Sequence, residues 1–127
     1  MREILFRGKA SSGKWEYGVP VFSGLNNEIA YIKQMHSYDA RVIPETVGQY
    51  SGLIDMNGNR IFEGDILIGA WNTKIVVYFD ECYLQFRARE VSTHARENAI
   101  DYYNNDKLEI VGNIYDNPEL LKVAAHG

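Results

Sequence analysis

Hydrophobic and polar residues alternate with a period of two over much of this chain, a pattern typical of β-strands. Three short stretches, at 3–6, 15–19 and 28–32, predict strands that form a hairpin or meander. Pro20 indicates an edge or a bend there, because proline cannot donate to a ladder. The periodicity dissolves over 34–45. We therefore expect an N-terminal β subdomain at 1–43 and a second region at 44–127, which can still pack as one unit.

The second region begins with a turn signal. Asn57-Gly58 lies between two apolar runs and predicts a tight hairpin turn, because both residues readily adopt positive φ. Further strands are predicted at 66–68, 74–79, 83–90 and 108–114, with turns at 63–65 and 80–81. In the strand at 83–90, Leu84, Phe86 and Ala88 are expected to face inward, and Tyr83, Gln85, Arg87 and Arg89 outward. Short antiparallel strands of this kind indicate a small β-barrel.

Two helical segments are expected beside these strands. Ala95, Ala99, Tyr102 and Tyr103 recur at helical spacing and predict a helical insertion over 93–104. Asn117-Pro118-Glu119 combines a residue that can cap a helix, a proline suited to the first turn and a favourable acid. A short C-terminal helix over 120–125 follows from that pattern.

Composition narrows the class of protein. A chain of 127 residues that is 46% hydrophobic and 24% charged builds one compact domain or two small subdomains, and is neither disordered nor fibrous. A net charge of −4 argues against a dominant nonspecific affinity for nucleic acid, although a local basic patch is compatible with it. The sequence has no apolar run of membrane-spanning length and no signal-peptide pattern, so we expect a cytoplasmic protein.

The sequence predicts no catalytic set, metal site or cofactor. Cys82 is the single cysteine, cannot form an intrachain disulfide, and is expected to be a buried small apolar residue. His36 with Asp39 and His94 with Glu97 are pairs three residues apart, for which solvated histidines are the simpler interpretation. One set of acids lies at strand ends, where turn formation explains it more simply than general acid–base chemistry: Asp55, Glu63, Asp65, Asp80 and Glu81.

The best sequence candidate for recognition is the outward face of the strand at 83–90. Tyr83, Arg87 and Arg89 offer a ring and two guanidinium groups, which can stack on a base and hold phosphate. A solvated strand face is the alternative.

Three blocks of the sequence resemble the YopX family of small phage and prophage proteins. The first is REILFRGK at 2–9 with WEYG at 15–18. The second, and strongest, is PETVGQYSGL at 44–53, continued by Asn57-Gly58 and by IFEGDI at 61–66. The third is VGNIYDNPELL at 111–121. Residues 23–43 and 70–106 cannot be matched one by one, and are expected to carry the individual specialisation.

The resemblance implies a mainly β protein whose second half is similar to an SH3-like barrel. It implies no reaction, cofactor or catalytic residue. Within the blocks, Gln49, Tyr50 and Asn113 are the polar or amphipathic residues that packing explains least, which suggests a shared interaction surface, with turn and core architecture as the alternative.

The leading hypothesis is a non-enzymatic phage-derived β module that binds a protein partner or a second copy of itself. A nucleic-acid-binding accessory protein using Tyr83, Arg87 and Arg89 is the runner-up. An enzyme with a site around the acid-bearing turns is the third.

Overall fold

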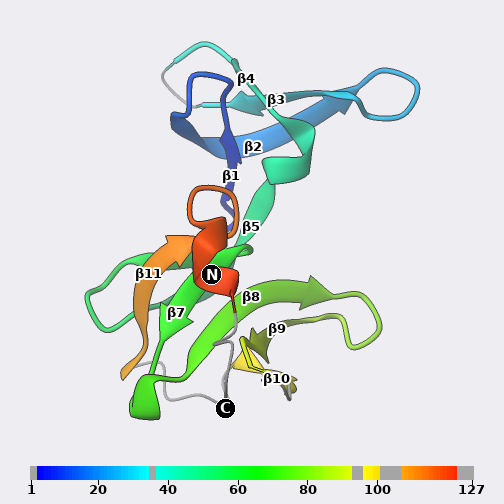
Figure 1. Ribbon diagram of the computed structural model, residues 1–127. Coiled ribbons are helices and arrows are strands. Elements are labelled where there is room, and N and C mark those ends of the chain that lie inside the picture. Colours follow the sequence, from blue (N-terminus) through cyan, green and yellow to red (C-terminus); the bar gives the residue numbers. More distant parts are fainter. Residues whose placement is uncertain (1–2, 35–36, 93–95, 101–106, 123–127) are drawn as a thin grey trace. The chain divides into compact units, whose positions relative to one another are not determined.

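The computed structural model describes residues 3–34, 37–92, 96–100 and 107–122, and their regular structure is almost entirely β-strand (Figure 1). The protein is mainly β, with two antiparallel sheets. The chain divides into two compact units, Met1–Tyr50 and Ser51–Gly127. The sequence places this division after residue 43 instead. The difference arises because strand β5 (Gly48–Ile54) begins by pairing with β1, Gly48 opposite Arg7 and Gln49 opposite Phe6.

The strands of the N-terminal unit belong to a six-stranded antiparallel sheet with the order β4-β3-β2-β1-β5-β6, in which β6 is contributed by the C-terminal unit. Its other strands are β1 (Phe6–Lys9), β2 (Trp15–Ser23), β3 (Ile29–Lys33) and β4 (Ala40–Val42). Strand β4 lies in the stretch 34–45, for which the sequence predicts no strand. Three residues are too few for alternation to be detected, and its pairing with β3 defines it.

Strand β2 changes partner half-way along its length. Residues from Trp15 to Gly18 pair with β1, and residues from Val19 to Ser23 pair with β3. Gly18 lies at the switch, where a Cβ atom would collide with the Lys33 carbonyl. Pro20 follows Gly18, in the part of β2 that pairs with β3 and no longer with β1 in the described residues. Pairing on one side only tolerates proline, which has no amide hydrogen to donate to a second neighbouring strand.

One face of the N-terminal sheet is buried. Ala30, Ile32 and Val42 form its small core, and Val47 packs against them. The short turn of 3₁₀ helix η1 (Pro44–Thr46) leads to Val47. Its Thr46 Oγ1 accepts a hydrogen bond from the Lys9 amide at 2.8 Å and donates to the Ile43 carbonyl at 2.6 Å. This buried hydroxyl joins η1 to β1 and so keeps the following residue, Val47, packed against the small core.

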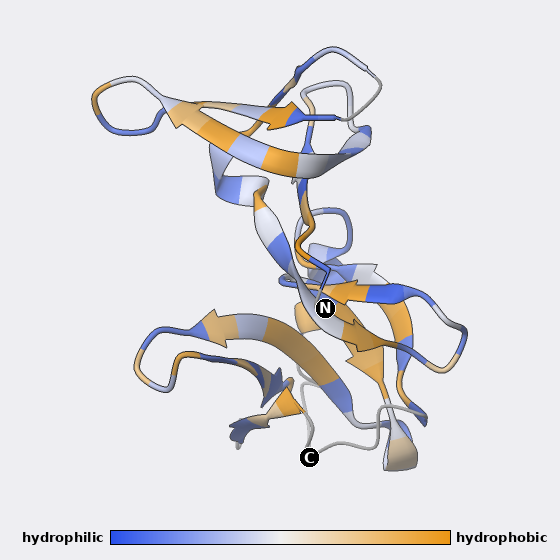
Figure 2. Ribbon diagram, turned by 180° about the vertical axis from the view of Figure 1, so that it is seen from behind, coloured by the Kyte–Doolittle hydropathy of each residue, from blue (hydrophilic) through white to orange (hydrophobic). Residues whose placement is uncertain are grey.

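The C-terminal unit contains a five-stranded antiparallel sheet in the order β10-β9-β8-β7-β11, and the second half of β5 pairs with β6. Its strands are β6 (Arg60–Phe62), β7 (Asp65–Ile68), β8 (Lys74–Asp80), β9 (Gln85–Glu90), β10 (Glu97–Ala99) and β11 (Glu109–Asn113). The larger core lies here, with the hydrophobic residues concentrated in the strands (Figure 2). Its buried members are Ile61, Leu67, Ile75, Val77, Ala88, Ile100 and Leu108.

The turn at Asn57-Gly58 is confirmed. The Gly58 amide donates to the Asp55 carbonyl at 3.0 Å, so Met56 and Asn57 are the two central residues of the turn. Gly58 has a φ of +82°, as expected, whereas Asn57 does not adopt the positive φ that the sequence predicts for it. Of the turn predicted at 63–65, Glu63 and Gly64 form a turn and Asp65 already begins strand β7; the strands predicted at 66–68 and 74–79 are confirmed.

Both predicted helices need correction. Within the predicted insertion at 93–104, residues Glu97–Ala99 form strand β10 paired with β9; residues 93–95 and 101–104 lie outside the described ranges. Of the C-terminal helix predicted over 120–125, Leu120 and Leu121 belong to a single 3₁₀ turn, η5 (Pro118–Leu121), which ends because Lys122 is extended; residues 123–125 lie outside the described ranges. The Asn117 side chain does not cap this turn; its Oδ1 accepts the Asn113 amide instead. None of the described helical segments has the length and apolar character needed to cross a membrane.

A buried carboxylate ties the Asn57-Gly58 hairpin to β11. Asp55 Oδ1 accepts the amides of Asn57 and Asn59, each at 2.9 Å, and Oδ2 accepts the amide of Ile110 at 3.1 Å. Asp55 is 4% exposed. Burial opposes its ionisation, but the donated amide hydrogen bonds outweigh that effect, so the pKa of Asp55 is lowered.

This geometry predicts that Asp55→Asn destabilises the C-terminal unit by about 1–3 kcal/mol, because an amide nitrogen cannot accept the hydrogen bond that one carboxylate oxygen now accepts. A lowered folded-state pKa gives stability that is complete above the unfolded value of about 4 and is lost as pH falls through the folded value. The difference between wild type and variant should therefore be constant above about pH 5 and shrink below about pH 4. Urea unfolding across this range measures it.

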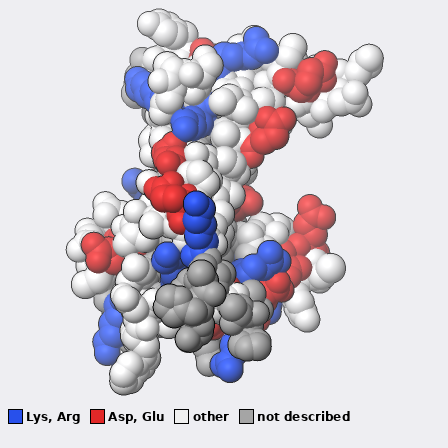
Figure 3. Space-filling view, viewed as in Figure 1, with Lys and Arg blue, Asp and Glu red and all other residues white. Residues whose placement is uncertain are grey.

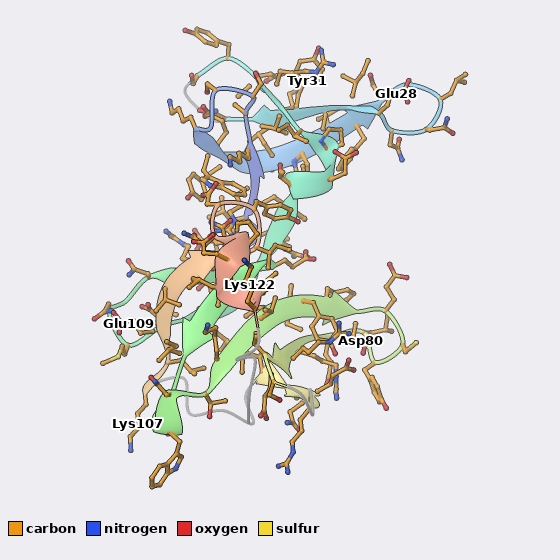
Figure 4. All side chains as sticks on the ribbon, in the orientation of Figure 1. Glu28, Tyr31, Asp80, Lys107, Glu109 and Lys122 are labelled. Atoms are coloured by element: carbon orange, nitrogen blue, oxygen red, sulfur yellow. The ribbon has the colours of Figure 1, made fainter. Side chains whose placement is uncertain are left out.

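Glu109→Gln is the matched control, because Glu109 is an exposed neighbour of Ile110 on the same strand (Figure 4). It should unfold like the wild type at every pH. A difference for Asp55→Asn that persists unchanged at pH 3 would contradict the role given to the carboxylate.

Candidate functional site

The structure brings Tyr83, Arg87 and Arg89 to one region of the C-terminal unit. Strand β9 alternates as predicted between Gln85 and Arg89: Ala88 is fully buried, while Arg87 and Arg89 lie on the opposite face. Arg87 pairs with Tyr78 on β8, and Arg89 pairs with Glu97 on β10. The face that the sequence singled out therefore exists, but it also carries acids from the neighbouring strands.

Arg87 is held by several groups of the protein. Its Nη1 donates to Gln85 Oε1 at 2.7 Å and its Nη2 to the Glu97 carbonyl at 3.2 Å. Its Nε lies 3.7 Å from Asp80 Oδ2, and its guanidinium lies over the Tyr83 ring at 4.5 Å. The Arg87 side chain is 15% exposed. These contacts make Arg87 part of the β8–β9 hairpin (Asp80 is labelled in Figure 4).

Arg89 is paired with Glu97. Its Nη2 lies 2.7 Å and its Nε 2.9 Å from Glu97 Oε1, and Glu97 Oε2 accepts the Tyr78 hydroxyl at 3.2 Å. The Arg89 guanidinium lies 5.4 Å from the Tyr78 ring centroid. Partial burial raises the pKa of Tyr78, and the Glu97 carboxylate acts in the same direction. Tyr78 is therefore a neutral hydrogen-bond donor at physiological pH.

These pairings remove most of the positive field from the predicted nucleic-acid face. Each arginine has a carboxylate beside it, Asp80 for Arg87 and Glu97 for Arg89. Figure 3 likewise shows basic and acidic side chains side by side on the face it views. Binding of phosphate at this face would have to compete with intramolecular ion pairs. The assignment of nucleic-acid contact to Tyr83, Arg87 and Arg89 stays a prediction without support from the local charges.

Of the predicted interaction residues, Asn113 has a structural role. Its Oδ1 accepts the amides of Tyr115 and Asp116 at 3.0 and 2.9 Å, and its Nδ2 donates to Asp116 Oδ2. Gln49 and Tyr50 are half-buried on β5, in the N-terminal unit, and the Tyr50 amide donates to the Leu5 carbonyl at 2.8 Å. Asn113 therefore builds the turn after β11, and Gln49 and Tyr50 help to attach β5 to the N-terminal sheet.

The acids at the strand ends also serve turns. Asp65 Oδ2 accepts the Phe62 amide at 2.7 Å, and Asp80 Oδ1 accepts the Cys82 and Tyr83 amides. Among the described residues, no group of three or more His, Cys, Asp or Glu could hold a metal ion. His36, His94 and His126 lie outside the described ranges. Cys82 is exposed in the turn between β8 and β9, so the expectation that it is buried is wrong.

The sequence also misplaced Leu84, which it expected to face inward. Residues 81–84 form the turn, and β9 begins only at Gln85. Leu84 has a φ of +52° and is 77% exposed. The left-handed conformation costs a branched L-residue about 1–2 kcal/mol relative to a right-handed one. Neither burial nor backbone preference explains a leucine at this position.

Trp71 shows the same combination more strongly. It lies with Asn72 in the turn between β7 and β8, at φ values of +61° and +59°. The Thr73 amide donates to the Ala70 carbonyl at 3.1 Å, so Trp71 occupies the first central position of a left-handed tight turn that favours Asn or Gly. The Trp71 side chain is 97% exposed. The sequence AWNT lacks the usual Gly or Asn-Gly signal, so periodicity alone did not reveal this residue.

Two hollows lie on the C-terminal unit near these residues. One, of ≈ 600 Å³, includes Asn72 of the left-handed turn together with Thr73 and Lys74. The other, of ≈ 530 Å³, has Tyr78 and Arg89 at its polar side and Val76, Ile114 and Leu121 at its apolar side. Both share the segment Glu90, Val91 and Ser92. The turn that contains Trp71 therefore lies at the edge of a concave surface.

Comparison with known proteins places this fold in a family. The model of the family described as YopX protein matches residues 11–122. The chain belongs to the YopX family. A solved structure titled "Crystal structure of protein EF1440 from Enterococcus faecalis" is similar over 96% of this chain and 100% of that chain, with a TM-score of 0.59 and 18% sequence identity. That likeness shows a shared fold. No curated protein matches the sequence.

The contacts of Arg87 predict that Arg87→Ala lowers the free energy of unfolding by about 1–3 kcal/mol, because it removes the partner of a mostly buried carboxylate and uncovers the Tyr83 ring. Arg96→Ala is the control, since Arg96 is exposed. Thermal unfolding should separate the two variants by several degrees. Equal melting temperatures would contradict the structural role given to Arg87.

The backbone at Leu84 predicts the opposite sign for Leu84→Asn. Asparagine tolerates the left-handed conformation better than leucine, so this variant should be as stable as the wild type or more stable by up to about 1 kcal/mol. Val111→Asn, which places the same residue on an extended strand, should be less stable than the wild type. A loss of stability in Leu84→Asn matching that of Val111→Asn would show that Leu84 supports the fold.

Proposed function

We propose that this YopX-family chain is a non-enzymatic accessory protein, encoded by a phage or prophage, that binds another protein in the bacterial cytoplasm through the C-terminal unit. The single observation that carries the proposal is Trp71, which is 97% exposed on a left-handed backbone. Folding stability alone would select Asn or Gly at this position. Tryptophan is, with tyrosine and arginine, the residue type most enriched among residues that dominate binding energy.

The partner that fits Trp71 is a protein with an apolar pocket wide enough for an indole ring. When a partner buries the Trp71 ring, apolar area is removed from water, which favours binding. The cost in conformational entropy is small, because the tight turn already fixes the backbone at Trp71. Leu84 and Tyr83, 77% and 66% exposed in the next turn, offer further apolar area at the other end of β8. The left-handed backbone at Trp71 and Leu84 lowers the stability of the fold, and a role in binding would explain why these residues are nevertheless present.

Two other features support this proposal rather than an enzyme. The carboxylates of Asp55, Asp65 and Asp80 accept backbone amides inside turns, which is a structural use of the groups that acid–base catalysis would need. The five short antiparallel strands around one core are also consistent with a variant of the SH3-like barrel, the fold expected from the family resemblance. The phage origin and the cytoplasmic location rest on that resemblance as well.

The proposal predicts that Trp71→Asn keeps or raises the melting temperature and loses the partner. A photo-crosslinking residue placed at the exposed Ala70, which leaves the neighbouring Trp71 in place, should give a discrete crosslinked product in bacterial cells. The same residue at Asn57, exposed in the β5–β6 turn, is the control and should give none. The captured protein, once purified, should bind the wild type at least about tenfold more tightly than Trp71→Asn, as loss of a central aromatic contact implies.

A captured second copy of the chain would support the protein-binding function and identify the partner. Equal binding of the purified partner to wild type and Trp71→Asn would overturn the role of Trp71. No product at position 70, together with a monomeric mass by sedimentation, would overturn the proposed function.

A further inference from the structure

The N-terminal sheet has a second face that is not part of its core. Residues directly opposite each other in an antiparallel pair lie on the same face. The pairs Arg7 with Tyr17, Lys9 with Trp15, Val19 with Lys33, Val21 with Tyr31, and Tyr31 with Arg41 therefore define one continuous face. Ala30, Ile32 and Val42, the core residues, lie on the other. We call the first set the open face.

The charge of the open face has one sign. Its four charged members are Arg7, Lys9, Lys33 and Arg41, whereas Glu16 alternates to the opposite face of β2, where its Oε2 accepts the Gln34 amide group. The whole N-terminal unit has six basic and five acidic residues, against seven and twelve in the C-terminal unit. The net negative charge of the protein thus comes from the other unit, and a basic face is compatible with it.

Aromatic and apolar side chains lie among these cations. Tyr17, Val19 and Val21 are 48%, 53% and 42% exposed along β2. The Arg41 guanidinium lies over the Tyr31 ring at 5.6 Å, and that of Arg7 over the Trp15 ring at 4.6 Å (Tyr31 is labelled in Figure 4). Arg7 is 7% exposed, so the accessible part of the face is formed by Tyr17, Val19, Val21, Tyr31, Lys33 and Arg41.

We propose that the open face binds single-stranded nucleic acid. Lys33 and Arg41 would contact backbone phosphates, and unpaired bases would lie against Tyr17, Tyr31 and the two valines. Sheets that bind single strands combine positive charge along the backbone path with rings on which bases stack. A double helix offers the same phosphates but keeps its bases stacked inside, so the exposed Tyr17 ring would have no base to stack on. This site lies on a different unit from Tyr83, Arg87 and Arg89.

The test is fluorescence anisotropy of a labelled oligothymidylate of about 20 nucleotides, long enough for several sites of the size that a small β platform covers. The double variant Lys33→Glu with Arg41→Glu should bind at least about tenfold more weakly than the wild type at low salt, with a smaller salt dependence. The matched control, Lys107→Glu with Lys122→Glu, makes the same change in net charge on the C-terminal unit and should retain most of the binding. Both control residues are exposed (Figure 4).

A second variant tests the rings without changing charge. Tyr17→Ala should weaken oligothymidylate binding by about fivefold or more, because one stacked base is lost, while the salt dependence stays unchanged. Circular dichroism spectra and melting curves identify any variant that fails to fold. Because Tyr17 is exposed and outside the core, its removal should leave the melting temperature close to the wild-type value.

No binding of oligothymidylate by the wild type at low salt would overturn the proposal, as would equal losses in the two double variants. Equal affinity for a blunt duplex of the same length, or for an oligoglutamate peptide, would also overturn it and indicate a face that binds any polyanion or an acidic protein segment. Trp71→Asn should bind the oligonucleotide like the wild type. A failure here therefore leaves the proposed protein-binding function untouched, and the reverse also holds.

Discussion

The C-terminal unit depends on the Asp55 carboxylate, which organises a hairpin and joins it to a strand distant in sequence. Two of the amides that it accepts belong to the Asn57-Gly58 turn, and the third belongs to Ile110 on β11. The adjacent amide of Met56 also donates to the Leu108 carbonyl at 2.8 Å. A buried acid is stabilised by the donors around it, so in the folded state the turn and the β11 connection stabilise each other.

Hydrogen bonds from backbone amides to a short polar side chain occur at other turns too. They explain the composition of the sequence blocks that carry the family resemblance. Asp65 binds the Phe62 amide, and Asn113 binds the amides of Tyr115 and Asp116. Short polar side chains can satisfy backbone donors that a tight turn leaves without a ladder partner. The Asn, Asp and Gly residues of these blocks therefore define a frame, and their presence in a sequence indicates the fold rather than an activity.

The sequence could predict the parts of the fold that depend on local chemistry. Asn57-Gly58 specifies its turn by backbone preference, and the alternation from Gln85 to Arg89 reflects one buried and one open side of the same strand. Strands β4 and β10 were missed because three-residue strands are defined by their partners. Leu84 was assigned inward because alternation was continued into a turn whose left-handed residue is not Gly or Asn.

The candidate sites were harder to predict, because a sequence lists charges without their neighbours. Arg87 and Arg89 look basic along the chain, yet Asp80 and Glu97 neutralise them across the strands. The reverse holds for the open face, where residues scattered from Arg7 to Arg41 become one basic surface only through the register of four strands. Trp71, Leu84, Tyr31, Lys33 and Arg41 all lie in stretches that the resemblance does not match residue by residue. Substitution of a residue that holds a turn would destabilise the fold, whereas most exposed residues can be substituted without unfolding it. A shared frame with different exposed turns and faces would let one fold serve different partners, because the exposed residues can vary while the turn residues hold the strands together.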